Sequence, residues 1–426
     1  MKKVGVAILG LGVVGGGTYK ILTDKKEFFA KNEGLDVSVE AVLEKYLERA
    51  DALGIDRSMV ASSIEEICSN SAVDIVVEVI GGVEPAKTFV LQALKSGKSV
   101  VTSNKELFAK HWPELEKTAK ENHAGLFFEA SCVGGVPIIR TLIDGMQANE
   151  IKSIKGIING TTNYILTKMA NEGSTYEEAL KEAQRLGYAD FNPTADVEGF
   201  DATYKISILS SLAFKTKIGI ENVHREGITS ITKEDIAFGK ELGYAIKLLA
   251  VGKNTEKGVE VRVHPAYVPL SNPLATVNDS FNAVHLVGDS VGEIMLYGRG
   301  AGALPTGSAI VSDVIFAAKH PSFYYTSFDN SEKGVKETKF ADDFISQYFI
   351  RLSVKDIAGV LSKISGLFAK YNVSIKEMKQ VAETGGNVPM VIVTHVCPES
   401  AVNKSLEKIK ELDGVISIDS VIRIED

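Results

Sequence analysis

Two carboxylates and a lysine lie close together in the segment 193–205. Asp201 and Lys205 stand at positions i and i+4, so a helix here places both side chains on one face, and Asp196 lies just ahead of them. Such spacing most often gives an exposed ion pair. Residues 206–212 are rich in apolar side chains, however, which predicts a buried helix. A buried charge pair is costly unless both charges are well satisfied or functional. The Asp201 carboxylate is therefore a candidate for holding Lys205 in place or for binding a substrate's amino group.

A second candidate lysine is Lys105, which ends the segment Val101-Thr-Ser-Asn-Lys. The segment is predicted to leave a strand and begin a helix at the carboxyl edge of a sheet, where ligands bind in open α/β folds. An ordinary structural lysine is slightly disfavoured at this position, because the helix dipole repels cations at a helix N-terminus.

The N-terminal segment contains the glycine-rich turn of dinucleotide-binding proteins. Gly10, Gly12 and Gly15 follow a predicted strand and open a predicted helix, with Val13 and Val14 between them. The first glycine permits the tight turn, the second lets a pyrophosphate approach the backbone, and the third lets the helix pack on the strand. The N–H groups and the dipole of the helix then face the anion. The motif is weak by itself, but it stands in the first βαβ unit of a parallel pattern, which is the context it requires.

The choice of dinucleotide depends on the residues at the end of the second predicted strand. Glu44 at this position favours NAD, because a carboxylate there binds the ribose 2′-hydroxyl. Lys45 beside it can neutralise a 2′-phosphate and favour NADP, or it can be a solvated loop charge. The pair leaves the choice open, with a mild preference for NADP.

The elements that must position these residues fall into three regions. Residues 1–130 alternate β-branched runs with helical segments, which predicts an α/β domain of the Rossmann type with a parallel, doubly wound sheet, to which residues 305–320 return as a helix. Residues 131–304 are predicted to form an α+β substrate and dimerisation domain with an open, mixed sheet. The predicted strands of these two regions are 4–9, 37–43, 73–80, 99–102, 125–129, 151–158, 259–263, 283–287 and 293–297.

A polar linker, 321–345, is predicted to lead to a third domain at 346–426. Its pattern is strand, helix, strand, strand, helix, strand, which is the ferredoxin-like βαββαβ arrangement.

Composition limits the classes of function. The net charge is −8 and no basic block interrupts it, so nucleic-acid binding has no electrostatic basis. Three widely spaced cysteines favour reduced thiols in a cytoplasmic chain. The uncharged run 4–19 is glycine-rich, which argues against a signal peptide, and no segment approaches the length of a membrane span. We therefore expect a small-molecule substrate, no nucleic-acid partner and no membrane.

Over essentially its whole length the sequence resembles homoserine dehydrogenase in the form that carries a C-terminal ACT domain. The most specific segments are Asn159-Gly-Thr-Thr-Asn-Tyr-Ile-Leu166 and Gly187–Lys205. Further segments that carry the resemblance are 10–15, 81–86, 101–105, 129–131 and 298–305.

The resemblance implies reversible NAD(P)H-dependent reduction of L-aspartate 4-semialdehyde to L-homoserine, in threonine, methionine and isoleucine biosynthesis. In this pattern Lys205 protonates the alkoxide formed by hydride transfer, and Lys105 lies at the junction of nicotinamide and substrate. The positions implied to bind substrate are Asp190, Asp196, Asp201, Tyr188, Thr162 and Gly187. Ser103 and Gly302 join the glycine-rich turn and Lys45 as implied cofactor contacts.

Two residues depart from the family's usual Gly-Tyr-x-Glu-x-Asp-Pro. Asp190 is one methylene shorter than the expected glutamate, and Asn192 removes a charge. The carboxylate chemistry is kept at position 190, but its reach to the substrate is in doubt.

The resemblance also implies a monovalent cation, usually sodium in this family, held by backbone carbonyls of a loop. The matching positions are Glu129, Cys132, Gly134 and Val136. Cys132 is then needed for its main chain, and a catalytic thiol is not expected because no histidine is near in sequence.

The third domain resembles an ACT domain, a family in which amino acids bind near the first helix and at interfaces between domains. Gly359, Asn372 and Ser374 are the positions where an effector is expected, with threonine as its identity, although many such domains only dimerise. A homodimer or homotetramer is expected. The alternative to an enzyme is a non-catalytic regulator that senses a dinucleotide and an amino acid.

Overall fold

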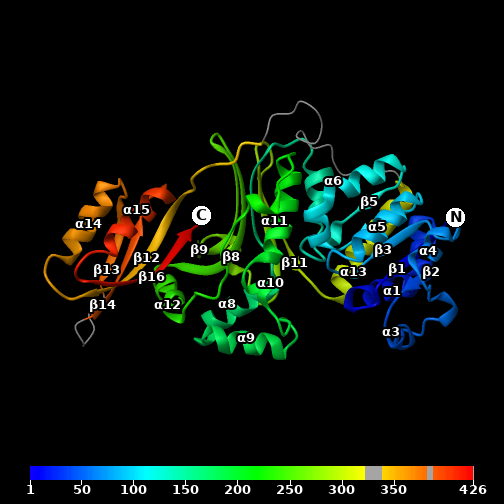
Figure 1. The fold of residues 1–426 in the computed structure, drawn as a ribbon, viewed down its shortest axis with the longest axis horizontal. Coiled ribbons are helices and arrows are strands. Elements are labelled where there is room, and N and C mark those ends of the chain that lie inside the picture. The colour runs from blue at the N-terminus through cyan, green and yellow to red at the C-terminus, as the bar shows by residue number, and fades with distance from the viewer. Residues whose placement is uncertain (322–337, 381–386, 426) are drawn as a thin grey trace.

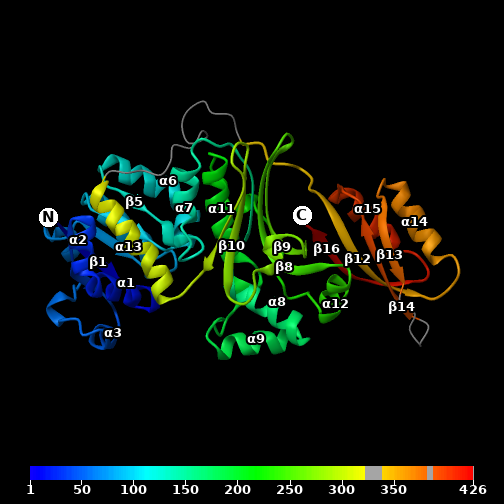
Figure 2. The ribbon, with the colours of Figure 1, turned by 180° about the vertical axis from the view of Figure 1, so that it is seen from behind.

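The computed structural model describes residues 1–321, 338–380 and 387–425. The molecule is elongated, and three parts follow one another along its long axis (Figure 1). The N-terminal sheet with its helices forms one end, the C-terminal strands and helices form the other, and the long middle strands lie between them, as the view from behind also shows (Figure 2). No helix within the described residues is both long and apolar enough to cross a bilayer.

The N-terminal part is built on a parallel sheet in the order β2-β1-β3-β4-β5. Its strands are near-continuous apolar runs because helices cover both faces, so the predicted doubly wound sheet is confirmed. The strands are β1 (Lys2–Leu9), β2 (Leu35–Leu43), β3 (Ile75–Glu78), β4 (Ser99–Thr102) and β5 (Leu126–Phe127). The helices are α1 (Val13–Asp24), α2 (Lys26–Glu33), α3 (Leu47–Ala52), α4 (Ile64–Ser69), α5 (Ala86–Lys95) and α6 (Lys105–Glu121), and α13 (Ala303–Lys319) packs on α1.

The middle part is an antiparallel run of strands, β11-β10-β6-β8-β9, with β7 parallel to β9 at its edge. The strands are β6 (Ile151–Ile157), β7 (His224–Arg225), β8 (Tyr244–Thr255), β9 (Gly258–Pro269), β10 (Phe281–Gly288) and β11 (Gly292–Arg299). The helices are α7 (Ile138–Arg140), α8 (Gly160–Glu172), α9 (Tyr176–Arg185), α10 (Thr194–Val197), α11 (Phe200–Ala213) and α12 (Lys233–Glu241). Helix α11 lies between this sheet and α6 of the first part, so it is buried on nearly all sides.

The C-terminal part has the strand order β16-β12-β14-β13 with two helices, which confirms the βαββαβ prediction. Its elements are β12 (Ile345–Lys355), α14 (Val360–Lys370), β13 (Ile375–Gln380), β14 (Asn387–Thr394), β15 (Cys397–Pro398), α15 (Glu399–Ile409) and β16 (Val415–Ile424).

The middle and C-terminal sheets are joined into one, which the sequence did not lead us to expect. β16 lies parallel to β9, with Arg423 opposite Ala266 and Ile424 opposite Tyr267. The next residue, Glu425, is buried, and its carboxylate accepts from Lys253 at 2.9 Å and Arg262 at 2.8 Å. The C-terminal part is therefore fixed to the middle part by both backbone pairing and buried ion pairs.

Helices α1 and α13 approach so closely that one position admits only glycine. A Cβ on Gly17 would lie 2.2 Å from the carbonyl oxygen of Ala303, whereas a Cβ on Gly16 would make ordinary contact with Leu53 at 3.7 Å. Because both glycines are in the interior of α1, the gain in helix propensity on substitution by alanine is the same for each.

We expect Gly17→Ala to lower the free energy of unfolding by about 1–3 kcal/mol, because the clash forces backbone movement. Gly16→Ala should leave the free energy of unfolding unchanged or raise it by up to about 1 kcal/mol. Urea unfolding followed by circular dichroism measures both. Equal effects of the two substitutions would show that the contact between α1 and α13 is not tight.

Candidate active site

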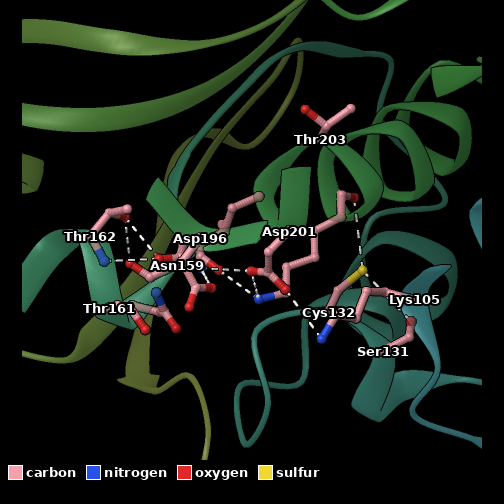
Figure 3. A network of polar contacts seen from close by, with 12 residues as sticks. Lys105, Ser131, Cys132, Asn159, Thr161, Thr162, Asp196, Asp201 and Thr203 are labelled. Atoms are coloured by element: carbon pink, nitrogen blue, oxygen red, sulfur yellow. Dashed lines mark hydrogen bonds and ion pairs between the residues drawn. The ribbon is translucent and has the colours of Figure 1, made fainter. Parts of the chain in front are cut away.

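The carboxylate of Asp201 is the centre of a buried polar network (Figure 3). Its Oδ2 accepts from Lys205 Nζ at 2.6 Å, one turn along α11, and its Oδ1 lies 3.2 Å from Lys105 Nζ. Asn159 Nδ2 donates to Asp201 at 2.9 Å and to Asp196 at 2.7 Å. The spacing argument from the sequence therefore gave the correct pair, and the fold brings Lys105 to the same carboxylate from another domain.

The charges of this network fix one another's protonation. Burial by itself would raise the pKa of Asp201, but the ammonium groups of Lys205 and Lys105 outweigh it and hold that pKa well below its usual range. In return, the Asp201 carboxylate raises the pKa of Lys105. Burial raises the pKa of Asp196, and the negative charge of Asp201 adds to that increase. The site thus contains a firmly ionised aspartate between two lysines, with a second carboxylate that protonates more readily.

These groups line a cavity of about 530 Å³ between the first and middle parts. Lys205 is mostly buried and also donates to the carbonyl oxygen of Ile158 at 2.9 Å, whereas the side chain of Lys105 is 42% exposed. The lining includes Val14 and Ser103 of the first part, together with Gly302 and Thr306 at the start of α13, and Gly160, Thr161, Gly187 and Tyr188 of the middle part. Two ammonium groups thus face a cavity of the size that small-molecule sites have.

The glycine-rich turn has the geometry that a pyrophosphate requires. Gly10 has a φ of 95°, and a Cβ on Gly15 would lie 1.9 Å from the carbonyl oxygen of Gly10. Gly12 is the N-cap of α1, and the space where its Cβ would stand is open. A phosphate can therefore reach the free N–H groups at the start of α1. Val13 is exposed in the first turn of the helix.

A second cavity, of about 1110 Å³, adjoins this turn and includes Gly10, Gly12, Lys45, Arg49 and Arg57. Glu44 also lies here, but its carboxylate is occupied, since it accepts from the backbone N–H of Leu11 at 2.6 Å and of Tyr46 at 2.9 Å. Burial would raise the pKa of Glu44, but these bonds lower it, so the carboxylate stays ionised and tied to the glycine-rich turn.

Not every residue expected at the substrate end faces the cavity. Asp190 is exposed and is not part of the cavity lining, while Asp196, Gly187 and Tyr188 are. Thr162 is buried and bonds to Asn159 Oδ1 with both its N–H, at 2.8 Å, and its hydroxyl, at 2.9 Å. Thr162 therefore supports Asn159, and its neighbour Thr161 lines the cavity.

The loop expected to hold a cation is tightly folded. Val133 and Gly134 both have positive φ, and a Cβ on Gly134 would lie 2.3 Å from the carbonyl oxygen of Gly300. The Glu129 side chain accepts from the N–H groups of Ile139 and Arg140, both at 2.9 Å, and burial raises its pKa to about 7. Within residues 1–321, 338–380 and 387–425, no cluster of His, Cys, Asp or Glu side chains could bind a metal ion.

The sequence reasoning missed Asn159 as a functional side chain. It is the N-cap of α8 at the end of β6, and one amide group both caps the helix and joins the two aspartates. An asparagine before Gly-Thr-Thr is a recognisable helix cap, but its donation to Asp196 and Asp201 depends on contacts distant in sequence. Ser280 also lines the cavity and carries no signal in the sequence, whereas Ser131 and Arg299, which line it too, lie in segments that carry the family resemblance.

The positions expected to bind an effector lie at opposite ends of one helix. Gly359 is the N-cap of α14, with a φ of 93°, while Asn372 and Ser374 follow its C-terminus. An 11-residue helix is about 16 Å long, so a single amino acid cannot touch both ends within one chain.

The Rossmann-type sheet, its open glycine-rich turn and a cavity with two lysines define a dinucleotide-dependent oxidoreductase. Comparison with known proteins agrees. Residues 10–129 match the family model of the homoserine dehydrogenase NAD-binding domain, residues 137–315 match homoserine dehydrogenase, and residues 348–414 match the ACT domain. The chain belongs to the homoserine dehydrogenase family, and it is an enzyme rather than a non-catalytic regulator.

Similar proteins extend over the whole chain. The homoserine dehydrogenase of Bacillus subtilis is 41% identical over 100% of this chain and 99% of its own length, and that of Mycobacterium tuberculosis is 40% identical over 100% and 98%. The crystal structure of the Thiobacillus denitrificans enzyme, 39% identical, covers 100% of this chain and 99% of its own with a TM-score of 0.93. A hyperthermophilic archaeal homoserine dehydrogenase in complex with NADPH, 30% identical, covers 76% of this chain and 100% of its own with a TM-score of 0.65.

Cys132 lies near the two lysines, but its burial disfavours the thiolate. It is fully buried, and burial raises its pKa to about 12. We expect iodoacetamide at pH 8 to alkylate the partly exposed Cys68 of the native protein and leave Cys132 unmodified, because the thiolate is the reactive form. Mass spectrometry of peptides measures this, with guanidinium-unfolded protein as the positive control. Modification of Cys132 at the rate of Cys68 would contradict the buried, protonated thiol.

Proposed function

We propose that this protein catalyses the reversible NAD(P)H-dependent reduction of L-aspartate 4-semialdehyde to L-homoserine. The observation that carries the proposal is the Asp201 carboxylate with Lys205 and Lys105 bound to it, in a cavity that opens from the dinucleotide turn. The family supports the reaction, and the geometry supports the assignment of its steps.

The lysines supply the proton and the positive charge that aldehyde reduction needs. A bound reduced nicotinamide supplies the hydride to the aldehyde carbon, and the oxygen becomes an alkoxide. Lys205, oriented by Asp201 and the carbonyl of Ile158, gives a proton to that oxygen. Lys105, which begins α6 at the edge of the parallel sheet, is placed at the nicotinamide junction and stabilises the developing negative charge.

The substrate's amino group is assigned to the acidic end of the cavity. Asp196 lines the cavity and is oriented by Asn159, and Tyr188 and Gly187 form the adjacent wall. Asp201 completes the acidic pair. Asp190, which is exposed and outside the lining, is assigned no direct contact, so its shorter side chain is no obstacle to binding.

For the dinucleotide we propose a preference for NADP over NAD. Glu44, the residue that would accept from a ribose 2′-hydroxyl, is already bound by two backbone N–H groups. Lys45, Arg49 and Arg57 line the same cavity and supply positive charge for a 2′-phosphate. The contacts of Gly10, Gly12, Val13, Val14, Gly15, Ser103 and Gly302 with the dinucleotide are part of this proposal.

A sodium ion at the loop 129–136 is a further part of the proposal. The carbonyl oxygen of Glu129 accepts only a long bond, 3.4 Å from the N–H of Cys132, and that of Val136 accepts from Ile138 at 2.8 Å. The positive φ values at Val133 and Gly134 turn the chain sharply, which suits converging carbonyls of Cys132 and Gly134. The ion would stabilise this loop beside Lys205, without a direct part in the chemistry.

Regulation is assigned to the ACT domain. We propose threonine as the effector and a homodimer or homotetramer as the assembly that binds it. Gly359 lies too far from Asn372 and Ser374 of the same chain to share one amino acid with them. Gly359 of one chain can share it with Asn372 and Ser374 of another chain. We propose that the chain divides into a dinucleotide-binding domain at 1–130, a substrate and dimerisation domain at 131–304, a linker at 321–345 and an ACT domain at 346–426.

Lys205→Ala should lower kcat for L-homoserine oxidation by about 100-fold to 10,000-fold, because a positioned proton-transfer group contributes that much. Nicotinamide absorbance measures turnover, with NADP⁺ and NAD⁺ compared in alkaline buffer containing sodium. The control is Lys181→Ala, an exposed lysine on α9, which should keep wild-type activity. Wild-type protein that reduces neither dinucleotide would overturn the proposed function.

Asp201→Asn should move the pH dependence of homoserine oxidation to lower pH. Oxidation needs a group that can accept the proton of the alcohol, so the wild-type rate should rise with pH between 7 and 9. The Asp201 carboxylate raises the pKa of Lys105, so its replacement by a neutral amide should let the Lys105 ammonium group, which stabilises the alkoxide, lose its proton at lower pH. The alkaline side of the rate profile should therefore move to lower pH. Initial rates from pH 7 to 10.5 measure this shift, and an unshifted profile would disconnect Asp201 from the ionisation of Lys105.

A further inference from the structure

A lysine buried in the middle sheet contacts a loop that reaches the active-site cavity. Lys247, on β8, is only 2% exposed. Its Nζ donates to the carbonyl oxygen of Val277 at 2.5 Å, to Asn278 Oδ1 at 3.1 Å and to Asn163 Oδ1 at 3.3 Å. All three acceptors are neutral, so hydrogen bonds rather than a contacting carboxylate offset much of the cost of burying the charge. Burial lowers the pKa of Lys247 to about 8, while the Asp279 carboxylate acts in the opposite direction.

The loop 277–281 is held from a second side by α8. Asn163 Nδ2 donates to the carbonyl oxygens of Val277 and Phe281, both at 3.1 Å. Thr167 Oγ1 accepts from the N–H of Asp279 at 3.1 Å, and Asp279 itself has a φ of 55°. The loop thus has a fixed, locally strained shape, and Lys247 is the group that binds its first two residues from the sheet side.

This loop forms part of the wall at the substrate end of the cavity. Ser280 lines the cavity, and its carbonyl oxygen lies 2.8 Å from where a Cβ on Gly160 would stand. Gly160 and Thr161 line the same region and follow Asn159 directly. A shift of the loop would therefore change the space next to Asn159 and Asp196 without touching either lysine of the network.

We propose that Lys247 is a positioning residue for substrate binding, which fixes the loop 277–281 so that Ser280 completes the wall of the cavity. The inference rests on the proposed function, because that function assigns this end of the cavity to the substrate. It concerns affinity for the substrate and leaves the transfer of hydride and proton to the residues already named.

The test is Lys247→Met, which keeps the apolar stem and removes the three donors. We expect KM for L-homoserine to rise about tenfold, with kcat and KM for NADP⁺ within about twofold of wild type, because only substrate contacts are lost. The matched control is Lys253→Met, the same substitution on the same strand, whose ammonium group binds Glu425. It should leave KM for L-homoserine unchanged, even if it lowers the melting temperature.

A second variant keeps the inference testable if Lys247→Met does not fold. Thr167→Val removes the tie to Asp279 from the α8 side and should raise KM for L-homoserine about threefold, since one neutral hydrogen bond is lost. Wild-type KM values in a folded Lys247→Met protein would overturn the positioning role. A lower kcat with an unchanged KM for L-homoserine would overturn it as well. Failure of wild-type protein to oxidise homoserine would instead overturn the proposed function, so the two failures are distinct.

Discussion

The site depends on one carboxylate that is kept charged away from water. Asp201 is 7% exposed, and desolvation of an isolated ion in such a place costs several kcal/mol. The compensation comes from two ammonium groups and one amide, supplied by α11, by the start of α6 and by the start of α8. Removing one partner of a buried pair costs about 3–5 kcal/mol. The Asp201 carboxylate therefore holds α11, α6 and α8 together, and this fixes the positions of the side chains that line the cavity between the first and middle parts.

That requirement explains the placement of α11. The helix is buried over nearly its whole length because it packs on β8 and β9 on one side and on α6 on the other. These contacts leave only 11% of the Lys205 side chain and 9% of the Asp201 side chain exposed, toward the cavity. In such surroundings an ion pair is stronger than in water, and loss of one partner is more costly. The same helix joins the two parts of the enzyme, and Lys105 of α6 and the acidic end of the cavity consequently meet at its N-terminal half.

Local patterns predicted most of the fold and the centre of the site. The alternation of strands and helices up to residue 130, the βαββαβ pattern and the i, i+4 pair Asp201–Lys205 all depend on residues near in sequence. The strand β8 was missed because Tyr244–Val251 is a nearly continuous apolar run, which periodicity cannot assign to strand or helix. Asn159, Ser280 and Lys247 act through partners far away in the chain, and the joining of β16 to β9 is likewise a contact between distant segments. The family resemblance implied a substrate contact for Asp190, whose side chain is exposed.

The pairing of β16 with β9 also sets an order of events during synthesis. β16 lies between β9 and β12, so the middle sheet and the ACT sheet each keep an open edge until residues 415–425 have been made. Unpaired edges of this kind are sites of aggregation. The nascent chain thus carries two exposed edges that a single strand closes together, and Glu425 secures that closure by binding Lys253 and Arg262. Folding of the middle and C-terminal sheets therefore depends on residues 415–425, whereas the parallel sheet of residues 2–127 is complete without them.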